Sequence, residues 1–272
     1  MGRLIFLIVS TLIFLSSFAA DTTLHLQPIK SIPGNYADFY TDNLQNIYFV
    51  SSATNQIKKI RSNGDSVGVF NNVVRYGKMY SLDVTNPLKV LVYYKDFATI
   101  IILDRFLATR TTIDLRRLNI LQVRAIAQSY DNNIWLYDEL EGKIKKIDEN
   151  NNVLLESSDL RLVFDDSLSP QKIIDNNGQL YLYDNRLGWL IFDYYSAFKK
   201  KLPFGNWGDV SAVDNTLYGR KENRFFYAPQ NDIDFHFLQT NLPADSIIKT
   251  QRQQDKLYVL TKEGIIIYQV VP

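Results

Sequence analysis

A short pattern that recurs about every forty residues is the feature that most restricts the fold of this chain. In each copy a turn leads into a strand of apolar and aromatic residues, and a polar loop and a second apolar strand follow. A period of this length is typical of repeat architectures, in which each repeat is one supersecondary unit. The strand centres lie 43, 44, 46, 37 and 40 residues apart, at Tyr48, Leu91, Trp135, Tyr181, Tyr218 and Tyr258.

These spacings are typical of the four-stranded blade of a β-propeller, which takes about 40–50 residues. The third strands of blades one and three both read Ile-Lys-Lys-Ile, and both are followed by an Asn-containing turn that suits a tight hairpin. No helical pattern of the length that βαβ units require separates the strands. The sequence therefore predicts an all-β propeller of about six four-stranded antiparallel blades. We expect blade one at 37–70, blade two at 79–115, blade three at 123–155, blade four at 170–204 and blade five at 209–239.

The two ends of the repeat region are complementary. The last unit has only three strands, at 247–249, 257–260 and 265–270, whereas residues 23–29 form a lone alternating segment before blade one. We expect this N-terminal segment to complete the last blade, because pairing there removes open sheet edges that invite aggregation.

Residues 1–20 have the pattern of a cleaved secretory signal peptide. Arg3 precedes an apolar run at 4–15, and small residues follow at 16–20. The run is shorter than the roughly 20 residues of a membrane span. We expect a single exported domain at 21–272, either periplasmic or associated with the outer membrane. The chain has no cysteine, so neither lipoprotein acylation nor a disulfide is expected.

The charge balance restricts the kind of partner. Lys and Arg total 30 and Asp and Glu total 29. Nucleic-acid affinity rests on a basic surface, so a nucleic-acid partner is not expected. An anionic membrane is likewise not expected as the main target, and contact with a membrane would be peripheral and through a partner.

Residues for catalysis are scarce. His25 and His236 are the two histidines, no Gly-x-Ser-x-Gly motif accompanies them, and the absence of cysteine argues against zinc. We therefore expect no catalytic residue, no metal and no cofactor. Aspartates near the ends of the innermost strands could instead line a central channel or hold Ca²⁺. Because they recur in register, the pattern favours hairpin caps; they are Asp42, Asp83, Asp131, Asp175 and Asp214.

One end of a propeller carries the loops between strands b and c and between strand d and the next strand a. These loops position functional groups on a rigid scaffold, and arginines and aromatics, which dominate interface energetics, gather in them here. We expect a non-catalytic protein-interaction or scaffold module of the cell envelope, with a protein partner. The alternative is a lactonase-like hydrolase or a small-ligand binder that uses carboxylates in the central channel. The candidate partner-binding residues are Arg75, Tyr76, Lys95, Arg116, Arg117, Asp138, Glu139, Arg186, Trp189 and Trp207.

The recurring Asp-Asn turns before aromatic strands, with the Ile-Lys-Lys-Ile strands, resemble the NHL/TolB-like superfamily of six-bladed propellers. That resemblance implies a fold and assigns no function. More narrowly, residues 36–42, 76–91 and 129–135 resemble an exported propeller family of Bacteroidota-type envelopes. This resemblance implies a link to the type IX secretion apparatus as an accessory subunit, and it identifies no active residue.

Overall fold

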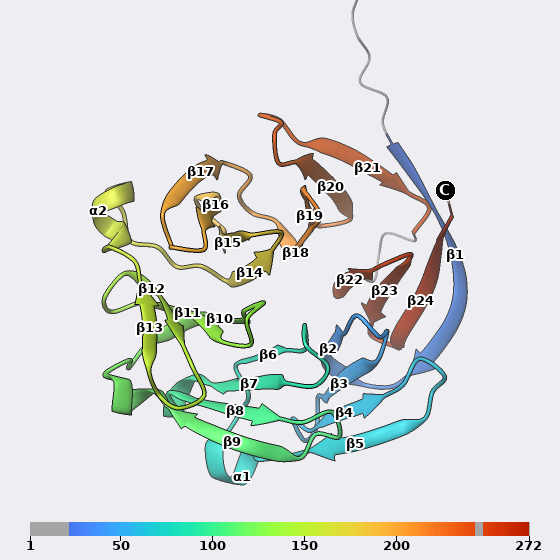
Figure 1. Cartoon of the computed structure of the whole chain (residues 1–272). Helices are drawn as coiled ribbons and strands as arrows, with labels where there is room; N and C mark the ends of the chain where they lie inside the picture. Colours follow the sequence, from blue (N-terminus) through green and yellow to red (C-terminus); the bar gives the residue numbers. More distant parts are fainter. Residues whose placement is uncertain (1–21, 243–246, 272) are drawn as a thin grey trace, which may run out of the picture.

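The computed structural model of this chain describes residues 22–242 and 247–271, so the predicted signal peptide lies outside the described residues. The described part is almost entirely β, with two short α-helices and two 3-10 turns. Figure 1 shows the sheets arranged around a common centre, with β2, β6, β10, β14, β18 and β22 innermost. The prediction of an all-β, propeller-type fold is confirmed.

Four separate sheets have four antiparallel strands each, as the blade pattern predicts. The central strands of the blades are continuous, mostly apolar runs that are buried on both faces, and turn residues with positive φ, such as Gln45 and Asn132, lie between the first and second strands. The strands, in chain order within each sheet, are β2 (Tyr36–Thr41), β3 (Ile47–Ser51), β4 (Ile57–Ile60) and β5 (Ser66–Phe70); β6 (Ser81–Asp83), β7 (Val90–Tyr94), β8 (Thr99–Leu103) and β9 (Thr109–Asp114); β10 (Val123–Gln128), β11 (Ile134–Asp138), β12 (Lys143–Ile147) and β13 (Val153–Glu156); β14 (Lys172–Asn176), β15 (Gln179–Asp184), β16 (Gly188–Asp193) and β17 (Phe198–Leu202).

The remaining eight strands form one sheet in the order β18-β19-β20-β21-β1-β24-β23-β22. The count of six separate blades is therefore wrong for this structure, which shows four separate blades and one eight-stranded sheet. The physical reason is β1, which pairs in parallel with β21 and antiparallel with β24, from His25 opposite Val271 to Pro33 opposite Gly264. The strands are β1 (Thr22–Pro33), β18 (Gly208–Val213), β19 (Thr216–Lys221), β20 (Arg224–Pro229), β21 (His236–Thr240), β22 (Lys249–Gln253), β23 (Lys256–Thr261) and β24 (Gly264–Val271).

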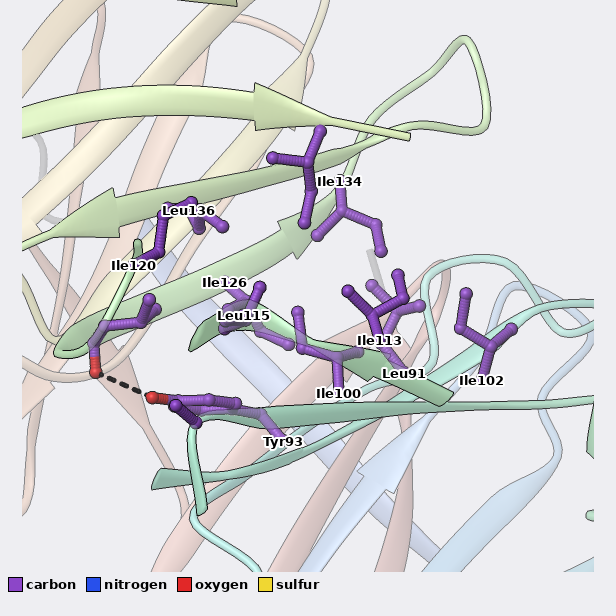
Figure 2. Packing of buried hydrophobic residues seen from close by; sticks show 13 residues of the cluster. Leu91, Tyr93, Ile100, Ile102, Ile113, Leu115, Ile120, Ile126, Ile134 and Leu136 are labelled. Atoms are coloured by element: carbon purple, nitrogen blue, oxygen red, sulfur yellow. Dashed lines mark hydrogen bonds between the residues drawn. The ribbon is translucent and has the colours of Figure 1, made fainter. Parts of the chain in front are cut away.

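The core lies between the faces of neighbouring sheets. Tyr93 and Ile100 of one sheet pack against Ile126 and Leu136 of the next, and the hydroxyl of Tyr93 donates to the carbonyl oxygen of Val123 at 3.3 Å (Figure 2). Similar clusters lie between the first and second sheets, between the third and fourth sheets, and between the fourth sheet and β18–β20. A further cluster joins β2–β4 to β23 and β24. Burial of this surface stabilises a fold that has no disulfide.

Short helical turns lie in three connections between the outer strand of one sheet and the inner strand of the next. They are α1 (Val73–Tyr76), η2 (Leu115–Leu118) and α2 (Leu160–Phe164), and η1 (Lys95–Phe97) joins β7 to β8. The sequence predicts a short helical turn or loop at 116–122, and η2 confirms it. In the part of the chain that the structure describes, no helix has the length and apolar character needed to cross a membrane.

Candidate functional site

The centre of the molecule contains a cavity of about 620 Å³. Residues of all six innermost strands line it, so it is bounded by β2, β6, β10, β14, β18 and β22. Small side chains such as Ala125, Ala127, Ser211 and Ala212 leave room between these strands. Small-molecule sites typically have volumes of about 300–1,000 Å³, so this cavity is large enough for one.

Four aspartates line the cavity, and Asp42 shows what they do. Its carboxylate accepts hydrogen bonds from the backbone N–H groups of Leu44 (3.0 Å) and Asn46 (2.9 Å) and from the Tyr48 hydroxyl (2.9 Å). Burial, together with this carboxylate, raises the pKa of Tyr48. The interpretation of Asp42 as a hairpin cap is confirmed. Asp83 caps its own turn in the same way, accepting from the N–H of Thr85 at 2.8 Å, and it also accepts from the N–H of Gln128 in the neighbouring sheet at 2.7 Å.

Asp175 joins two sheets, which the hairpin-cap interpretation did not predict. Its carboxylate accepts from the Ser129 hydroxyl (3.1 Å), the Tyr130 N–H (3.2 Å) and the Trp135 Nε1 (3.0 Å). Ser129 and Tyr130 lie in the turn between β10 and β11, and Trp135 lies in β11. The Tyr194 hydroxyl donates to its other oxygen at 2.6 Å. Asp175 is therefore a structural bridge between the third and fourth sheets.

Asp209 has an unusual backbone as well as a fully engaged carboxylate oxygen. It lies at an irregularity of the β18–β19 register and has φ of +53°, which costs a non-glycine residue about 1–2 kcal/mol. Its Oδ2 accepts from Arg220 Nε (2.7 Å) and from the N–H (2.8 Å) and hydroxyl (3.0 Å) of Thr250. Each carboxylate of the cavity lining thus accepts at least two hydrogen bonds from the chain itself.

Two of the four cations in the lining also have partners. The Lys249 ammonium lies 2.6 Å from Asp38 Oδ1, donates to the carbonyl oxygen of Phe39 and sits 3.9 Å from the centre of the Tyr40 ring. Arg252 lies over the ring of Tyr218 at 5.3 Å. The ion pair neutralises Lys249, whereas Arg252 makes a cation–π contact and has no carboxylate partner among the described residues.

The other two cations, Arg124 and Lys172, have no carboxylate partner among the described residues. Arg124 makes no hydrogen bond or ion pair there, and its Nε is buried without an acceptor. Lys172 donates one hydrogen bond, to the carbonyl oxygen of Val210 at 2.9 Å. Water reaches the Lys172 side chain in the channel, yet desolvation by the surrounding walls, and then repulsion from Lys249, lower its pKa. The sequence analysis did not single out either residue.

The cavity lacks the groups of the commonest hydrolytic sites. None of its lining residues is a histidine: His25 lies in β1, and His236 in β21 is 3.2 Å from Asp232. Within residues 22–242 and 247–271, no cluster of three or more His, Asp or Glu side chains could hold a metal ion. Asp131 and Asp214, which the sequence places near inner strands, do not line the cavity.

Four of the ten candidate partner-binding residues are buried in the folded chain, and their role in binding a partner stays a prediction. Trp189 is fully buried against Tyr181 and Tyr183, and Trp207 stacks between Phe204 and Phe226. The other two buried residues are Tyr76, which packs against Tyr94 and Phe97, and Asp138, which lies 3.0 Å from the Lys145 ammonium.

The other six candidate residues reach the surface, and their role stays a prediction. Arg116 is held by Asp114 at 2.8 Å and Arg186 by Asp166 at 3.0 Å. Glu139 accepts from Gln122, and Lys95 lies over the Tyr80 ring. Arg75, which lies over the ring of Tyr76, and Arg117 are exposed.

A repeated Asp-Leu-Arg motif explains why Arg116, and with it Arg161 of α2, is held in place. In Asp114-Leu115-Arg116 and Asp159-Leu160-Arg161 the aspartate caps the helical turn and accepts from the N–H and Nε of the arginine. The intervening leucine is buried in both copies. The motif is visible in the sequence, and its recurrence at a helix N-terminus could have identified these arginines as structural.

Comparisons with known proteins identify the fold and leave the family open. No family model matches the chain, and no curated protein matches it. Among solved structures, a streptogramin B lyase is similar over 86% of this chain and 78% of its own, with 14% identity and a TM-score of 0.61. Two structures of virginiamycin B lyase from Staphylococcus aureus are similar over 86% of this chain and 80% of theirs, with 12% identity and TM-scores of 0.60. One of these is a catalytically inactive histidine-to-alanine variant with quinupristin.

At this level of identity the likeness shows the fold alone, which is a β-propeller arrangement. The comparisons give no support for a link to type IX secretion or to Bacteroidota. The described part of the chain has no nucleic-acid-binding fold.

Proposed function

We propose that the chain is a six-bladed ring whose central cavity binds a small ligand without catalysing its conversion. The observation that supports binding is the 620 Å³ cavity, whose lining includes Arg124 and Lys172 without a charged partner among the described residues. A ligand site combines a concave surface with a few polar groups left available for contact.

The ring follows if the eight-stranded sheet comprises two blades that meet at β1. In this reading β18–β21 form blade five, and β22–β24 with β1 form blade six. All six inner strands line one cavity, and Gln251 of β22 exchanges hydrogen bonds with the backbone of Thr41 in β2, which joins the last blade to the first.

Engineered disulfides test this assembly in solution, because the native chain has no cysteine. Gln27 of β1 lies opposite Gln269 of β24, at a separation that suits a disulfide. The Gln27→Cys/Gln269→Cys pair should cross-link on oxidation, whereas the control pair Gln27→Cys/Gln122→Cys should not. Absence of the first cross-link would contradict the six-bladed ring.

A carboxylate-based hydrolase is the alternative that the site supports less well. Such an enzyme needs an inward aspartate or glutamate that is available for proton transfer. Asp42, Asp83, Asp175 and Asp209 are instead occupied by two to four hydrogen bonds each. The lyase likeness does not supply the missing group, because the variant in complex with quinupristin is inactivated by loss of a histidine and this cavity has none.

Ligand screening with an obstructed cavity tests the proposed function. Thr85 and Val213 line the cavity and are exposed to it, so Thr85→Trp/Val213→Trp should narrow it without overfilling the core. Val69 and Thr54 are similarly exposed outside the lining, and Val69→Trp/Thr54→Trp is the matched control. Metabolites that raise the Tm of the native chain and of the control, but not of the obstructed variant, bind the cavity. Equal shifts in all three proteins, or none in the native chain, would overturn the proposal.

A protein-interaction role is a second candidate because of one surface feature. The end that carries α1, η2 and α2 exposes apolar side chains beside its arginines, including Val74, Leu121, Leu140 and Leu162. Exposed apolar residues next to arginine are common at interfaces. Recovery of a stoichiometric partner by the native chain, and its loss in Val74→Asp/Leu162→Asp, would favour this role. Export and an envelope location stay proposals from the sequence of residues 1–20.

A further inference from the structure

Neighbouring inner strands place a charged or hydroxyl side chain at one level of the channel, although other charged lining residues, such as Asp83 and Asp175, lie at another level. The register pairs Ser81 with Tyr93, Lys172 with Tyr183 and Lys249 with Leu260, and these partners occupy equivalent positions in β7, β15 and β23. Arg124 precedes Ala125, which pairs with the equivalent Tyr137 of β11. These side chains therefore start from the same height in their blades, near the end that carries the helical connections.

Arg124 owes its position to a break in the ladder. The β10–β11 register shifts between Val123 and Ala125, so Arg124 is the extra residue of a bulge. Bulges redirect the side chain of the extra residue and are frequent beside functional sites. Here the bulge puts Arg124 into the lining of the cavity without any acceptor from the described chain.

The charges at this level do not cancel in pairs. Lys249 is neutralised by Asp38 and Asp209 by Arg220, which leaves Arg124 and Lys172 as two positive groups on the neighbouring strands β10 and β14. On the next inner strand, β6, the hydroxyl of Ser81 is buried and has no partner in the described residues. Arg124 and the Ser81 hydroxyl have no acceptor among the described residues, and Lys172 has only the Val210 carbonyl oxygen, so the three side chains form a set of donors for an anion.

We infer that the cavity ligand carries a carboxylate or phosphate group, which binds between Arg124 and Lys172 and accepts a hydrogen bond from Ser81. This inference rests on the proposed function, because it names the ligand of the same cavity. The anion supplies the negative charge that no described residue places beside Arg124 and Lys172. The guanidinium of Arg124 has paired N–H donors that suit a planar carboxylate or a phosphate. The rest of the ligand occupies the wider cavity below this level.

Calorimetric titration at constant ionic strength tests the inference with four probes: inorganic phosphate, glycerol 3-phosphate, succinate and citrate. At least one of these probes should bind the native chain. Tighter binding of the two phosphates would indicate a phosphate site, and tighter binding of succinate and citrate would indicate a carboxylate site. Arg124→Gln and Lys172→Gln should each weaken binding of the tightest-binding probe about 10-fold or more, as expected for hydrogen bonds to charged groups. Arg124→Lys should retain part of the affinity that Arg124→Gln loses, because lysine keeps the positive charge but lacks the paired N–H donors of the guanidinium.

Lys58→Gln is the matched control, because Lys58 is exposed on β4 outside the cavity and the net charge changes equally. It should change affinity less than twofold, and circular dichroism should show that all variants fold. Binding of the probes that is unchanged in both Gln variants would overturn the inference.

Failure of the inference can be separated from failure of the proposed function. If no anion binds while neutral metabolites bind the native chain and not the obstructed variant, the cavity is a ligand site but the anion inference is wrong. If no metabolite of any charge binds, both are wrong.

Discussion

The indole Nε1 of Trp135 donates a 3.0 Å hydrogen bond to the carboxylate of Asp175, across the boundary between two neighbouring sheets. Three other donors share this carboxylate, so a residue at the rim of the cavity is committed to holding the fold together. The same holds for the other aspartates of the lining. The charged groups of the lining that remain available for a ligand are therefore cations, among them Arg124 and Lys172, which have no carboxylate partner among the described residues.

Replacement of Asp175 should show its structural role. Asp175→Ala leaves four donors without their acceptor, and we expect the free energy of unfolding to fall by about 2–4 kcal/mol. Asp96 is exposed in η1, and Asp96→Ala should change stability by less than about 0.5 kcal/mol. Urea titration of the three proteins measures both effects. A loss in Asp175→Ala no larger than in the control would mean that the bridge does not stabilise the fold.

Loss of the positive charge at Lys145 and at Arg124 should have different effects on the free energy of unfolding. Lys145 lies 3.0 Å from Asp138, which is 1% exposed, so Lys145→Met leaves a buried carboxylate unpaired and should cost about 3–5 kcal/mol. Arg124 has no such partner, so Arg124→Met should leave stability unchanged or raise it by up to about 1 kcal/mol in the absence of ligand. Thermal and urea unfolding compare the two. A comparable loss in Arg124→Met would show that the protein itself satisfies Arg124.

The affinity for an anion should fall as pH rises. The fall should begin at a lower pH than it would if Lys172 had the ordinary pKa of a lysine. Lys172 attracts an anion only when protonated, and its pKa is lowered by desolvation and by Lys249, against the opposing effect of Asp83, Asp209 and Asp38. The loss of affinity should therefore begin below the usual lysine pKa of about 10.4. Titration with succinate at rising pH measures it, since the charge of succinate is constant above neutrality. In Lys172→Gln the affinity should be weak and nearly independent of pH over the same range.

Gly219 is expected to be essential to the packing of Trp207. A Cβ at this position would lie 2.5 Å from Cε3 and 2.9 Å from Cβ of Trp207, which is held in a stack of aromatic rings. Gly219→Ala should therefore destabilise the chain by about 1–3 kcal/mol and alter tryptophan fluorescence. Gly208→Ala is the control, because the nearest atom to its Cβ is Arg220 O at 3.6 Å. Equal stability of the two variants would contradict this packing.

The sequence predicts the blades well because their signals are local. Recurring apolar and aromatic strands and Asn-rich turns locate β2–β5 and β10–β13 to within a few residues, and Asp42 acts as the cap that its spacing suggests. The eight-stranded sheet could not be predicted from local signals, because it depends on β1 pairing with both β21 and β24, which lie at the other end of the chain.

The candidate site was harder to predict, because its features depend on contacts between blades. Whether Trp189 and Trp207 are exposed depends on the sheet that covers them, and both are buried. Arg124 becomes available through a bulge, and no local pattern around it indicates one. Asp175 looks like the other hairpin aspartates but accepts from a neighbouring sheet.

A high-resolution structure of the protein at saturating concentration of its best anionic probe tests the central claim most directly. The account predicts ligand density in the central cavity, with the carboxylate or phosphate between Arg124 and Lys172 and within hydrogen-bond distance of both. An empty cavity, with the ligand bound instead on the outer surface beside α1 or α2, would contradict it.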